Sequence, residues 1–150
     1  MTMARDAGAL RALVTGATGG IGRATSFALL DAARRRGLQL RIAVGASRPG
    51  ASLDALVRDL EAEGAVAFGV AADLADAAAC TRLAEDAVER CEGLDILVSN
   101  AGIARGAPLA SLDVVDWDAV FAIDVRATWL LARAAHPALA RSCGAIVAVA

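Results

Sequence analysis

The 150-residue sequence contains no tyrosine and no lysine, because all 15 of its basic residues are arginines. Neither a phenol nor a side-chain amine is therefore present for acid–base chemistry. Histidine occurs once, as His136, and a single imidazole excludes a histidine-rich metal site. We expect His136 to pack or to face solvent, and we predict no metal site.

Cysteine is also scarce, with three residues and no CxxC pair. Cys80 and Cys91 stand 11 positions apart, which places them roughly 16 Å apart along a helix. That separation is too long for a disulfide. We expect these two residues and Cys143 to be buried, reduced thiols.

Charge of one sign is not in excess, since the net charge is −2 at pH 7 and the isoelectric point is about 5.3. A basic surface for nucleic acid is therefore not expected. No uncharged apolar run approaches the roughly 20 residues that cross a bilayer, so we predict no membrane contact. The N-terminus carries Arg5, Asp6 and Arg11 without an apolar core, unlike a secretory signal, and we expect a cytoplasmic protein.

Apolar segments are abundant and alternate with helical stretches, which predicts one α/β domain with a Rossmann-type, doubly wound parallel sheet. The sheet is expected to be incomplete, with about five strands and four helices. Strands are predicted at residues 11–15, 40–45, 65–70, 94–99 and 145–150. Helices are predicted at residues 21–36, 52–63, 76–91 and 111–139. The expected N-caps of the last three helices are Ser52, Asp76 and Ser111.

A glycine-rich turn follows the first predicted strand and opens the first helix, in the segment TGATGGIG. Gly16 permits a tight turn, Gly20 lets the backbone approach a pyrophosphate, and Gly22 lets helix and strand pack closely. The helix N-terminus adds free N–H groups and a partial positive charge for phosphates. The segment therefore predicts a dinucleotide site.

Two further strand ends carry polar residues that suit this ligand. Ser47 and Arg48 follow the second strand, where an acidic residue would favour NAD. A hydroxyl and a guanidinium can instead bind a 2′-phosphate, so NADP(H) is favoured over NAD(H). After the third strand, Asp73 can accept a hydrogen bond from the adenine amino group, and Leu74 can pack on the ring.

Taken together, these segments resemble a short-chain dehydrogenase/reductase over nearly the whole chain. The matching residues are Thr15, Gly16, Gly20, Ile21 and Gly22 for TGxxxGIG, Asp73 for the adenine-contacting aspartate, Ser99-Asn100-Ala101-Gly102 for NNAG, and residues 117–131 for the following helix. The resemblance implies NADP(H)-dependent interconversion of a small carbonyl or alcohol by hydride transfer. The cofactor-binding residues are then Thr15, Gly16, Thr18, Gly20, Ile21, Gly22, Ser47, Arg48, Asp73, Leu74, Asn100, Ala101 and Gly102.

The family's catalytic residues are an Asn, a Ser, a Tyr and a Lys. The Asn position matches Asp124, which accepts hydrogen bonds but has no amide proton to donate. The Ser would follow the fifth strand, and the Tyr and Lys would come later still. We therefore expect residues 1–150 to be a partial NAD(P)-binding domain without the C-terminal catalytic part, and to be inactive alone.

Two other functions remain open at this point. The chain can be a non-catalytic nucleotide-binding or redox-sensing module, or one subunit of a split enzyme. The turn also fits TGxxGxxG through Gly16, Gly19 and Gly22, a pattern of the family's extended and atypical branches, which include redox-sensing regulators. A methyltransferase is disfavoured by the turn's spacing. Since the last strand is an apolar edge, we expect a homo-oligomer or a complementing C-terminal segment.

Overall fold

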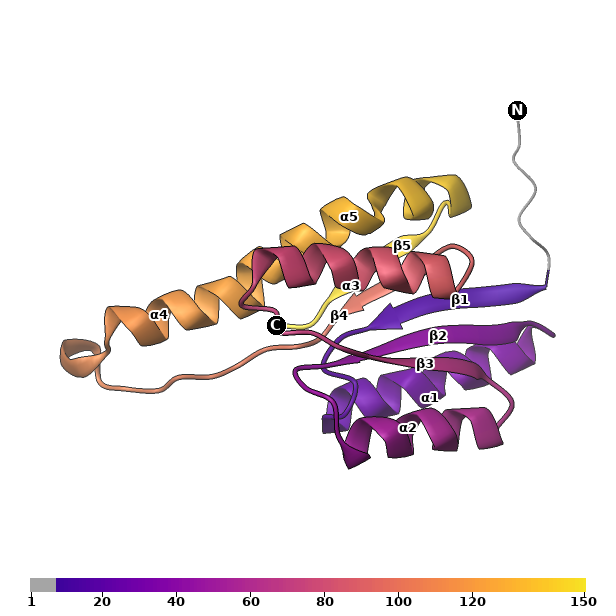
Figure 1. The fold of residues 1–150 in the computed structure, drawn as a ribbon, viewed down its shortest axis with the longest axis horizontal. Coiled ribbons are helices and arrows are strands. Elements are labelled where there is room, and N and C mark those ends of the chain that lie inside the picture. The colour runs from indigo at the N-terminus through magenta and orange to yellow at the C-terminus, as the bar shows by residue number, and fades with distance from the viewer. Residues whose placement is uncertain (1–7) are drawn as a thin grey trace.

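Five parallel strands form the centre of the chain, and helices cover both faces of their sheet (Figure 1). This computed structural model describes residues 8–150, so the expectation about an N-terminal signal lies mostly outside the described residues. The spatial order of the strands is β3-β2-β1-β4-β5. Their bounds are β1 (Ala9–Val14), β2 (Gln39–Ala46), β3 (Val66–Ala71), β4 (Ile96–Ser99) and β5 (Ala145–Ala148).

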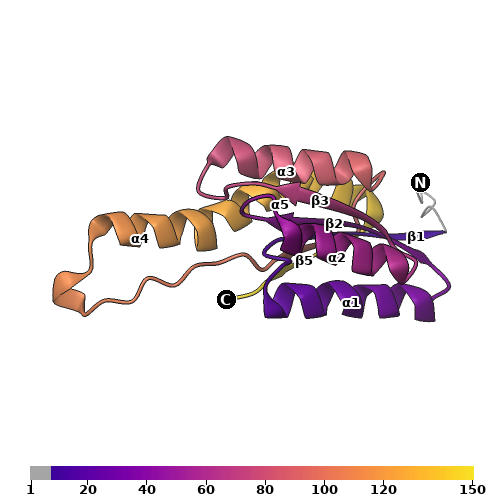
Figure 2. The ribbon, with the colours of Figure 1, turned by 60° about the horizontal axis from the view of Figure 1, so that its bottom comes forward.

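One helix follows each of the first three strands, and a longer helical run leads into the last strand. The helices are α1 (Gly20–Arg35), α2 (Ala51–Ala62), α3 (Ala77–Arg90), α4 (Val114–Val120) and α5 (Ala127–Ser142), with a π-helical segment η2 (Phe121–Arg126) joining the last two. Helices α1 and α2 lie on one face of the sheet, and α3 and α5 lie on the other (Figure 2). With α4, η2 and α5 taken as one helix, the predicted fold of five strands and four helices is confirmed.

Alternation along the strands builds two hydrophobic cores. In β1, Leu13 packs with α3 and α5, whereas Val14 packs with α1 and α2. The neighbouring strand β2 does the same with Ala43 and Val44. Both faces of a parallel sheet are buried in this way, and its strands therefore consist of nearly continuous apolar residues.

The strand order reverses next to β1. From β1 the chain winds outward to β2 and β3, and it then crosses to β4 and β5 on the other side. In open α/β sheets, ligands bind at the carboxyl ends of the strands where this reversal leaves a crevice. The relevant ends here are those of β1 and β4, which pair with each other in the sheet.

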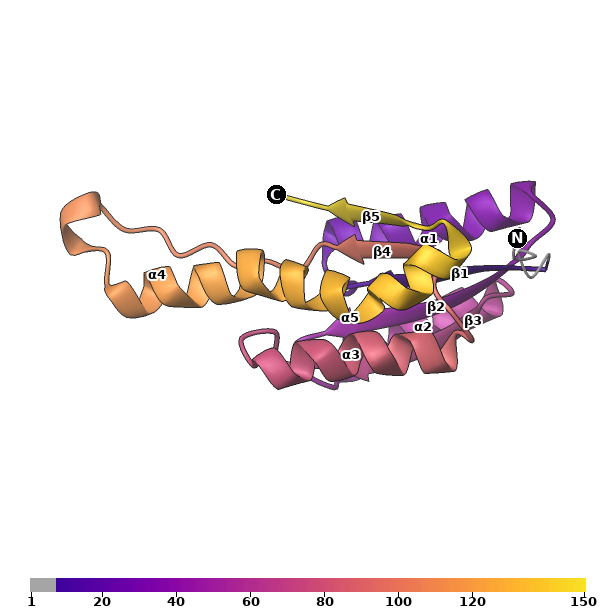
Figure 3. The same ribbon diagram turned by 90° about the horizontal axis from the view of Figure 1, so that it is seen from above.

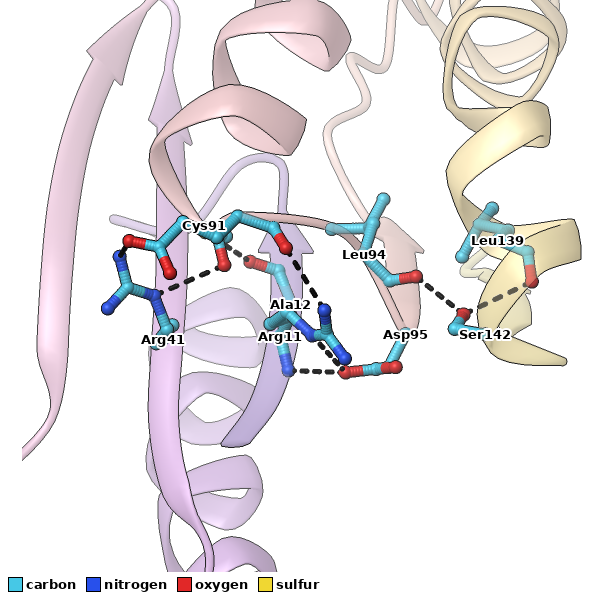
Figure 4. Close-up of polar contacts among 9 residues, drawn as sticks. Arg11, Ala12, Arg41, Cys91, Leu94, Asp95, Leu139 and Ser142 are labelled. Carbon is cyan, nitrogen blue, oxygen red and sulfur yellow. Dashed lines mark hydrogen bonds and ion pairs between the residues drawn. The ribbon is translucent and has the colours of Figure 1, made fainter. Parts of the chain in front are cut away.

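A cluster of arginines ties the opposite end of the sheet together (Figure 4). The Nε atom of Arg11 lies 3.1 Å from a carboxylate oxygen of Asp95, and its Nη1 donates to the carbonyl of Glu92 at 3.0 Å. Arg41 donates from Nε to the carbonyl of Cys91 at 3.1 Å. The bonds to Glu92 and Cys91 satisfy backbone carbonyls at the C-terminal end of α3. No backbone N–H within the helix is left to donate to these carbonyls. The arginine bonds join β1, β2 and α3 at the end away from the crevice.

Of the two caps predicted for α2 and α3, one is confirmed. Asp76 caps α3, and its side chain accepts from the backbone N–H of Ala78 at 2.9 Å. Ser52 does not cap α2, because the helix already begins at Ala51 and Gly50 occupies the N-cap position. The carbonyl of Gly50 accepts the first helical hydrogen bonds, and Ser52 therefore lies inside the first turn.

The final helical run differs most from its prediction. Ser111 does not cap it; this residue ends a short 3-10 turn (Leu109–Ser111), where its hydroxyl donates to the carbonyl of Pro108 at 3.2 Å. Asp113 caps α4 instead, accepting from the amide two residues further on at 2.8 Å. The run also continues to Ser142, beyond the predicted end at residue 139.

Two parts of the fold are open to solvent. All four residues of β5 are exposed, and α4 projects past the end of the sheet (Figure 3). The exposed large apolar residues of the helical run are Val114, Val115, Trp117, Phe121, Val125 and Trp129. Across residues 8–150, no helix combines the length and the apolar character needed to cross a membrane.

Candidate functional site

The crevice at the carboxyl ends of β1 and β4 contains a pocket of about 440 Å³. This volume falls in the range of small-molecule sites, roughly 300–1,000 Å³. The walls come from the turn after β1, the ends of β2 and β3, the loop after β4, and η2. The predicted site residues that line it are Thr15, Gly16, Thr18, Gly20, Ile21, Ser47, Asp73, Leu74, Asn100, Ala101 and Gly102.

The three glycines chosen from the sequence have different surroundings. Gly16 has a φ of +61°, a left-handed conformation that favours glycine. A Cβ on Gly22 would overlap the carbonyl oxygen of Gly16 and lie 2.7 Å from the Cα of Ala17, so this position permits the close helix–strand packing. A Cβ on Gly20 would have no atom within 4 Å. Gly20 therefore faces open space in the pocket, as a residue next to a ligand should.

The N-terminus of α1 points its free amide groups toward this pocket. Gly19 occupies the N-cap position and offers no side chain to bond to them, and the first turn contains no acidic residue. The first N–H groups of a helix have no intrahelical partner and carry the positive end of its dipole. An anionic ligand such as a phosphate fits this end of the helix.

Thr15 and Asn100 lock the turn to the end of β4. The buried Thr15 hydroxyl oxygen accepts from the backbone N–H groups of Asn100 and Ala101, both at 3.0 Å. The side-chain amide of Asn100 donates to the carbonyls of Thr15 at 3.0 Å and Gly16 at 3.2 Å. Both polar side chains therefore hold the turn in position, and both residues also line the pocket.

The end of β2 adds a second hollow beside the first. It has a volume of about 280 Å³ and shares Thr18 and Ser47 with the main pocket. Arg48 lines this hollow together with the first residues of α2. Its guanidinium makes no ion pair within residues 8–150. A cation, a hydroxyl and the start of a helix thus surround a hollow that shares lining residues with the main pocket.

The end of β3 supplies the next wall. Asp73 is exposed at the pocket and accepts a hydrogen bond from the N–H of Ala75 through Oδ1, at 2.9 Å. Leu74 is buried, with 8% of its surface exposed, and lies in the core cluster that also contains Leu83. A buried leucine and an exposed carboxylate therefore lie next to each other at this wall of the pocket.

Asp124 lies in η2, at the rim of the pocket. Its Oδ1 accepts from the backbone N–H of Ile103 at 2.9 Å, and a Cβ on Gly102 would lie 3.3 Å from the same oxygen. The carboxylate therefore holds the loop after β4. The π-helical geometry around Asp124 is of a kind that often occurs at functional sites.

Some contacts at and near the site gave no signal in the sequence. Ile103 and Ile123 line the pocket as apolar side chains, although each reads as an ordinary core residue. The buried Ser99 hydroxyl lies 2.8 Å from that of Thr128, a contact between β4 and α5. Only the packing of distant segments brings these groups together.

The remaining titratable candidates lie away from the pocket opening. Burial raises the pKa of the Cys91 thiol to about 11, and burial also raises the pKa of the Cys80 thiol. Both cysteines are buried and unpaired as predicted, whereas Cys143 is exposed, because it follows the end of α5 beside the open edge. His136 is exposed on α5. Within residues 8–150, no group of three potential ligands is placed to hold a metal.

Fold and site together define a class, the doubly wound α/β proteins with a glycine-rich turn at the point where the strand order reverses. A family model described as short chain dehydrogenase matches residues 11–150. The chain belongs to this short-chain dehydrogenase family, which confirms the resemblance drawn from its motifs.

Relatives of the chain agree with this assignment. It is 32% identical over 123 residues to the 3-oxoacyl-[acyl-carrier-protein] reductase of Synechocystis sp., covering 82% of the chain and 47% of that protein. A short-chain dehydrogenase from Burkholderia cenocepacia, solved in complex with NADP, superimposes with a TM-score of 0.80 at 34% identity, over 90% of this chain and 53% of that one.

A third relative was solved with the other nicotinamide cofactor. The NADH-dependent reductase A1-R', complexed with NAD, gives a TM-score of 0.80 at 30% identity. The match covers 92% of this chain and 55% of that reductase. The chain thus spans about half the length of the relatives it matches.

Proposed function

We propose that residues 1–150 form the cofactor-binding part of an NADP(H)-dependent oxidoreductase that interconverts a carbonyl and an alcohol. The observation that carries this proposal is the pair of adjoining hollows, one at the start of α1 and one at the end of β2 beside Arg48. The first suits a pyrophosphate and the second a 2′-phosphate. The Burkholderia relative that was solved with NADP supports this choice, and the NAD-bound reductase supports the alternative.

Each wall of the pocket has a role under this proposal. The open side of Gly20 and the amides at the start of α1 hold the pyrophosphate. Ser47 and Arg48 bind the 2′-phosphate, and Asp73 with Leu74 holds the adenine. Thr18, Ile21, Ala101 and Gly102 line the remaining surface, and Thr15, Gly22 and Asn100 keep the turn in shape.

The chemistry divides between the cofactor and the protein. A bound nicotinamide supplies or accepts the hydride. Asp124 stands where the family has an Asn, and we propose that its carboxylate keeps the loop at residues 102–103 against the rim of the site. Since the 150 residues include neither tyrosine nor lysine, we propose that they bind the cofactor without turning over a carbonyl substrate.

Titration of the purified chain with NADPH and with NADH, followed by nicotinamide fluorescence, tests the cofactor assignment. We expect NADPH to bind more tightly. R48A should weaken NADPH binding about tenfold, because a charge-assisted phosphate contact is lost, and should leave NADH binding within about twofold. R58A, which removes an exposed arginine of α2 outside both hollows, is the matched control. Equal loss for both cofactors would contradict the role of Arg48.

The non-catalytic alternative and the main proposal both predict that residues 1–150 alone do not turn over a carbonyl substrate. A redox-sensing module, or one subunit of a split enzyme, also lacks the tyrosine and lysine and also binds the nucleotide. NADPH oxidation by the purified chain with a carbonyl substrate would therefore contradict both the non-catalytic role and the proposed lack of turnover. Recovery of activity only after a second polypeptide is added would favour the split enzyme.

The open surfaces support a partner, as predicted from the sequence. The exposed strand β5 and the apolar side chains of Trp117, Phe121 and Trp129 remain uncovered by residues 8–150. We propose that a second copy of the chain or a complementing C-terminal segment covers them. Sedimentation of the purified chain distinguishes these two, because only the first gives a dimer or larger species without an added polypeptide.

A further inference from the structure

Arg126 connects two segments that are far apart in the sequence. It lies at the end of η2, and its Nη2 donates to the carbonyl of Ala75 at 2.5 Å, across 51 positions of the chain. That carbonyl belongs to the loop between β3 and α3. The same loop carries Asp73 and Leu74, both of which line the main pocket.

Both backbone polar groups of Ala75 are hydrogen-bonded. Its N–H donates to Oδ1 of Asp73 at 2.9 Å, and its carbonyl accepts from Arg126. The preceding carbonyl, that of Leu74, accepts from the buried thiol of Cys80 at 3.3 Å. Because Ala75 bonds to the carboxylate directly, a shift of this residue moves Asp73 at the pocket wall. Arg126 therefore fixes the orientation of that carboxylate from outside the pocket.

The segment that carries Arg126 also bonds to the other side of the pocket. Asp124, two positions earlier in η2, accepts from the N–H of Ile103 in the loop after β4. One six-residue π-helical segment thus bonds to the loop after β3 and to the loop after β4. The pocket wall at Asp73 is therefore held both by Arg126 of η2 and by hydrogen bonds within the loop after β3.

We propose that Arg126 is a positioning residue for adenine recognition, holding the loop at residues 73–76 so that Asp73 meets the adenine amino group. This inference rests on the proposed function, since it assigns a further residue to the same dinucleotide site. Arg126 does not line either hollow, so its effect passes through Ala75 and Asp73.

The test compares NADP with its 1,N6-ethenoadenine analogue, whose adenine has no free amino group. Wild type should bind NADP more tightly than the analogue. R126A should weaken NADP binding roughly three- to tenfold and the analogue by less than about twofold, so that discrimination between the two is lost. R126K retains a cation and should restore part of the discrimination. A merely structural role would weaken both ligands equally.

R82A is the matched control, because Arg82 pairs with Asp76 of the same loop from the solvent side, at 3.4 Å, without touching Ala75. It should discriminate like wild type. Equal affinities of R126A and wild type for both ligands, or equal loss for both, would overturn the role of Arg126. If wild type binds neither ligand, the proposed function fails and this role fails with it. If wild type binds both equally, only the adenine contact and Arg126's part in it are overturned.

Discussion

Thr15 accepts two hydrogen bonds from Asn100, which link the two central strands. The Thr15 hydroxyl accepts from the backbone N–H of Asn100 at 3.0 Å, and the Thr15 carbonyl accepts from the Asn100 side-chain amide at 3.0 Å. The end of β4 therefore sets the shape of the glycine turn after β1. A site formed in this way is preorganised, which lowers the cost of binding a ligand.

Replacing Thr15 tests this link. T15V keeps the shape of the side chain but removes the acceptor for the N–H groups of Asn100 and Ala101. Each unsatisfied N–H costs about 1–3 kcal/mol, so we expect the loss of both bonds to lower the free energy of unfolding by about 2–6 kcal/mol. T15S keeps the hydroxyl and should lose less than about 1.5 kcal/mol. Urea denaturation measures both, and equal losses would show that the hydroxyl does not bear on stability.

The glycines of the turn should separate folding from binding. A Cβ on Gly20 enters open space, so G20A should leave the melting temperature nearly unchanged while it weakens NADPH binding. A Cβ on Gly22 overlaps the Gly16 carbonyl, so G22A should lower both. Thermal unfolding and NADPH titration of the two variants provide the comparison. A G20A chain that binds NADPH like wild type would place the pyrophosphate elsewhere.

The three cysteines should differ in reactivity. Cys143 is exposed, whereas Cys80 and Cys91 are buried, and burial raises the pKa of both buried thiols. Since the thiolate is the reactive form, a native sample at pH 8 should release one equivalent of thionitrobenzoate rapidly from Ellman's reagent. C143S should abolish that phase. A fast-reacting thiol in C143S would mean that the structure around Cys80 or Cys91 opens readily to the reagent.

The Cys91 thiol also predicts a dependence of stability on alkaline pH. Its pKa is raised by burial from 9.0 to about 11, so the unfolded chain loses this proton at lower pH than the folded chain. The resulting stabilisation is complete below pH 9 and is lost as the pH rises toward 11. Within that window this group should lower the free energy of unfolding by up to about 1.4 kcal/mol per pH unit. C91A should show a shallower decline in urea titrations, and an unchanged slope would contradict the shift.

Much of the fold could be predicted because parallel strands buried on both faces leave apolar runs that glycines and polar residues interrupt. The final helical run could not. Ser111 and Asp113 are both good capping residues two positions apart, and local sequence does not choose between them. The choice depends on the turn at Pro108, whose carbonyl accepts a hydrogen bond from the Ser111 hydroxyl. Nor does the pattern of apolar residues reveal the π-helical segment that follows α4.

The site divides in the same way. The glycines are identifiable because backbone geometry demands them within a few residues of each other. Arg126 is not identifiable, since its partner Ala75 is 51 positions away and contributes only a carbonyl. The contact between Ser99 and Thr128 likewise exists only once β4 and α5 have packed. Local motifs thus predicted the glycine-rich turn that lines the pocket, and the supporting contacts emerged only from the tertiary structure.

The most direct test is a 15N NMR titration of the chain with NADPH. We predict that the amide signals of Gly16, Gly20 and Ile21 shift the most, together with those of Ser47 and Arg48, because the cofactor's phosphates would lie against these groups. Largest shifts at amides outside both hollows, or no shift at millimolar NADPH, would contradict a dinucleotide site at the end of β1.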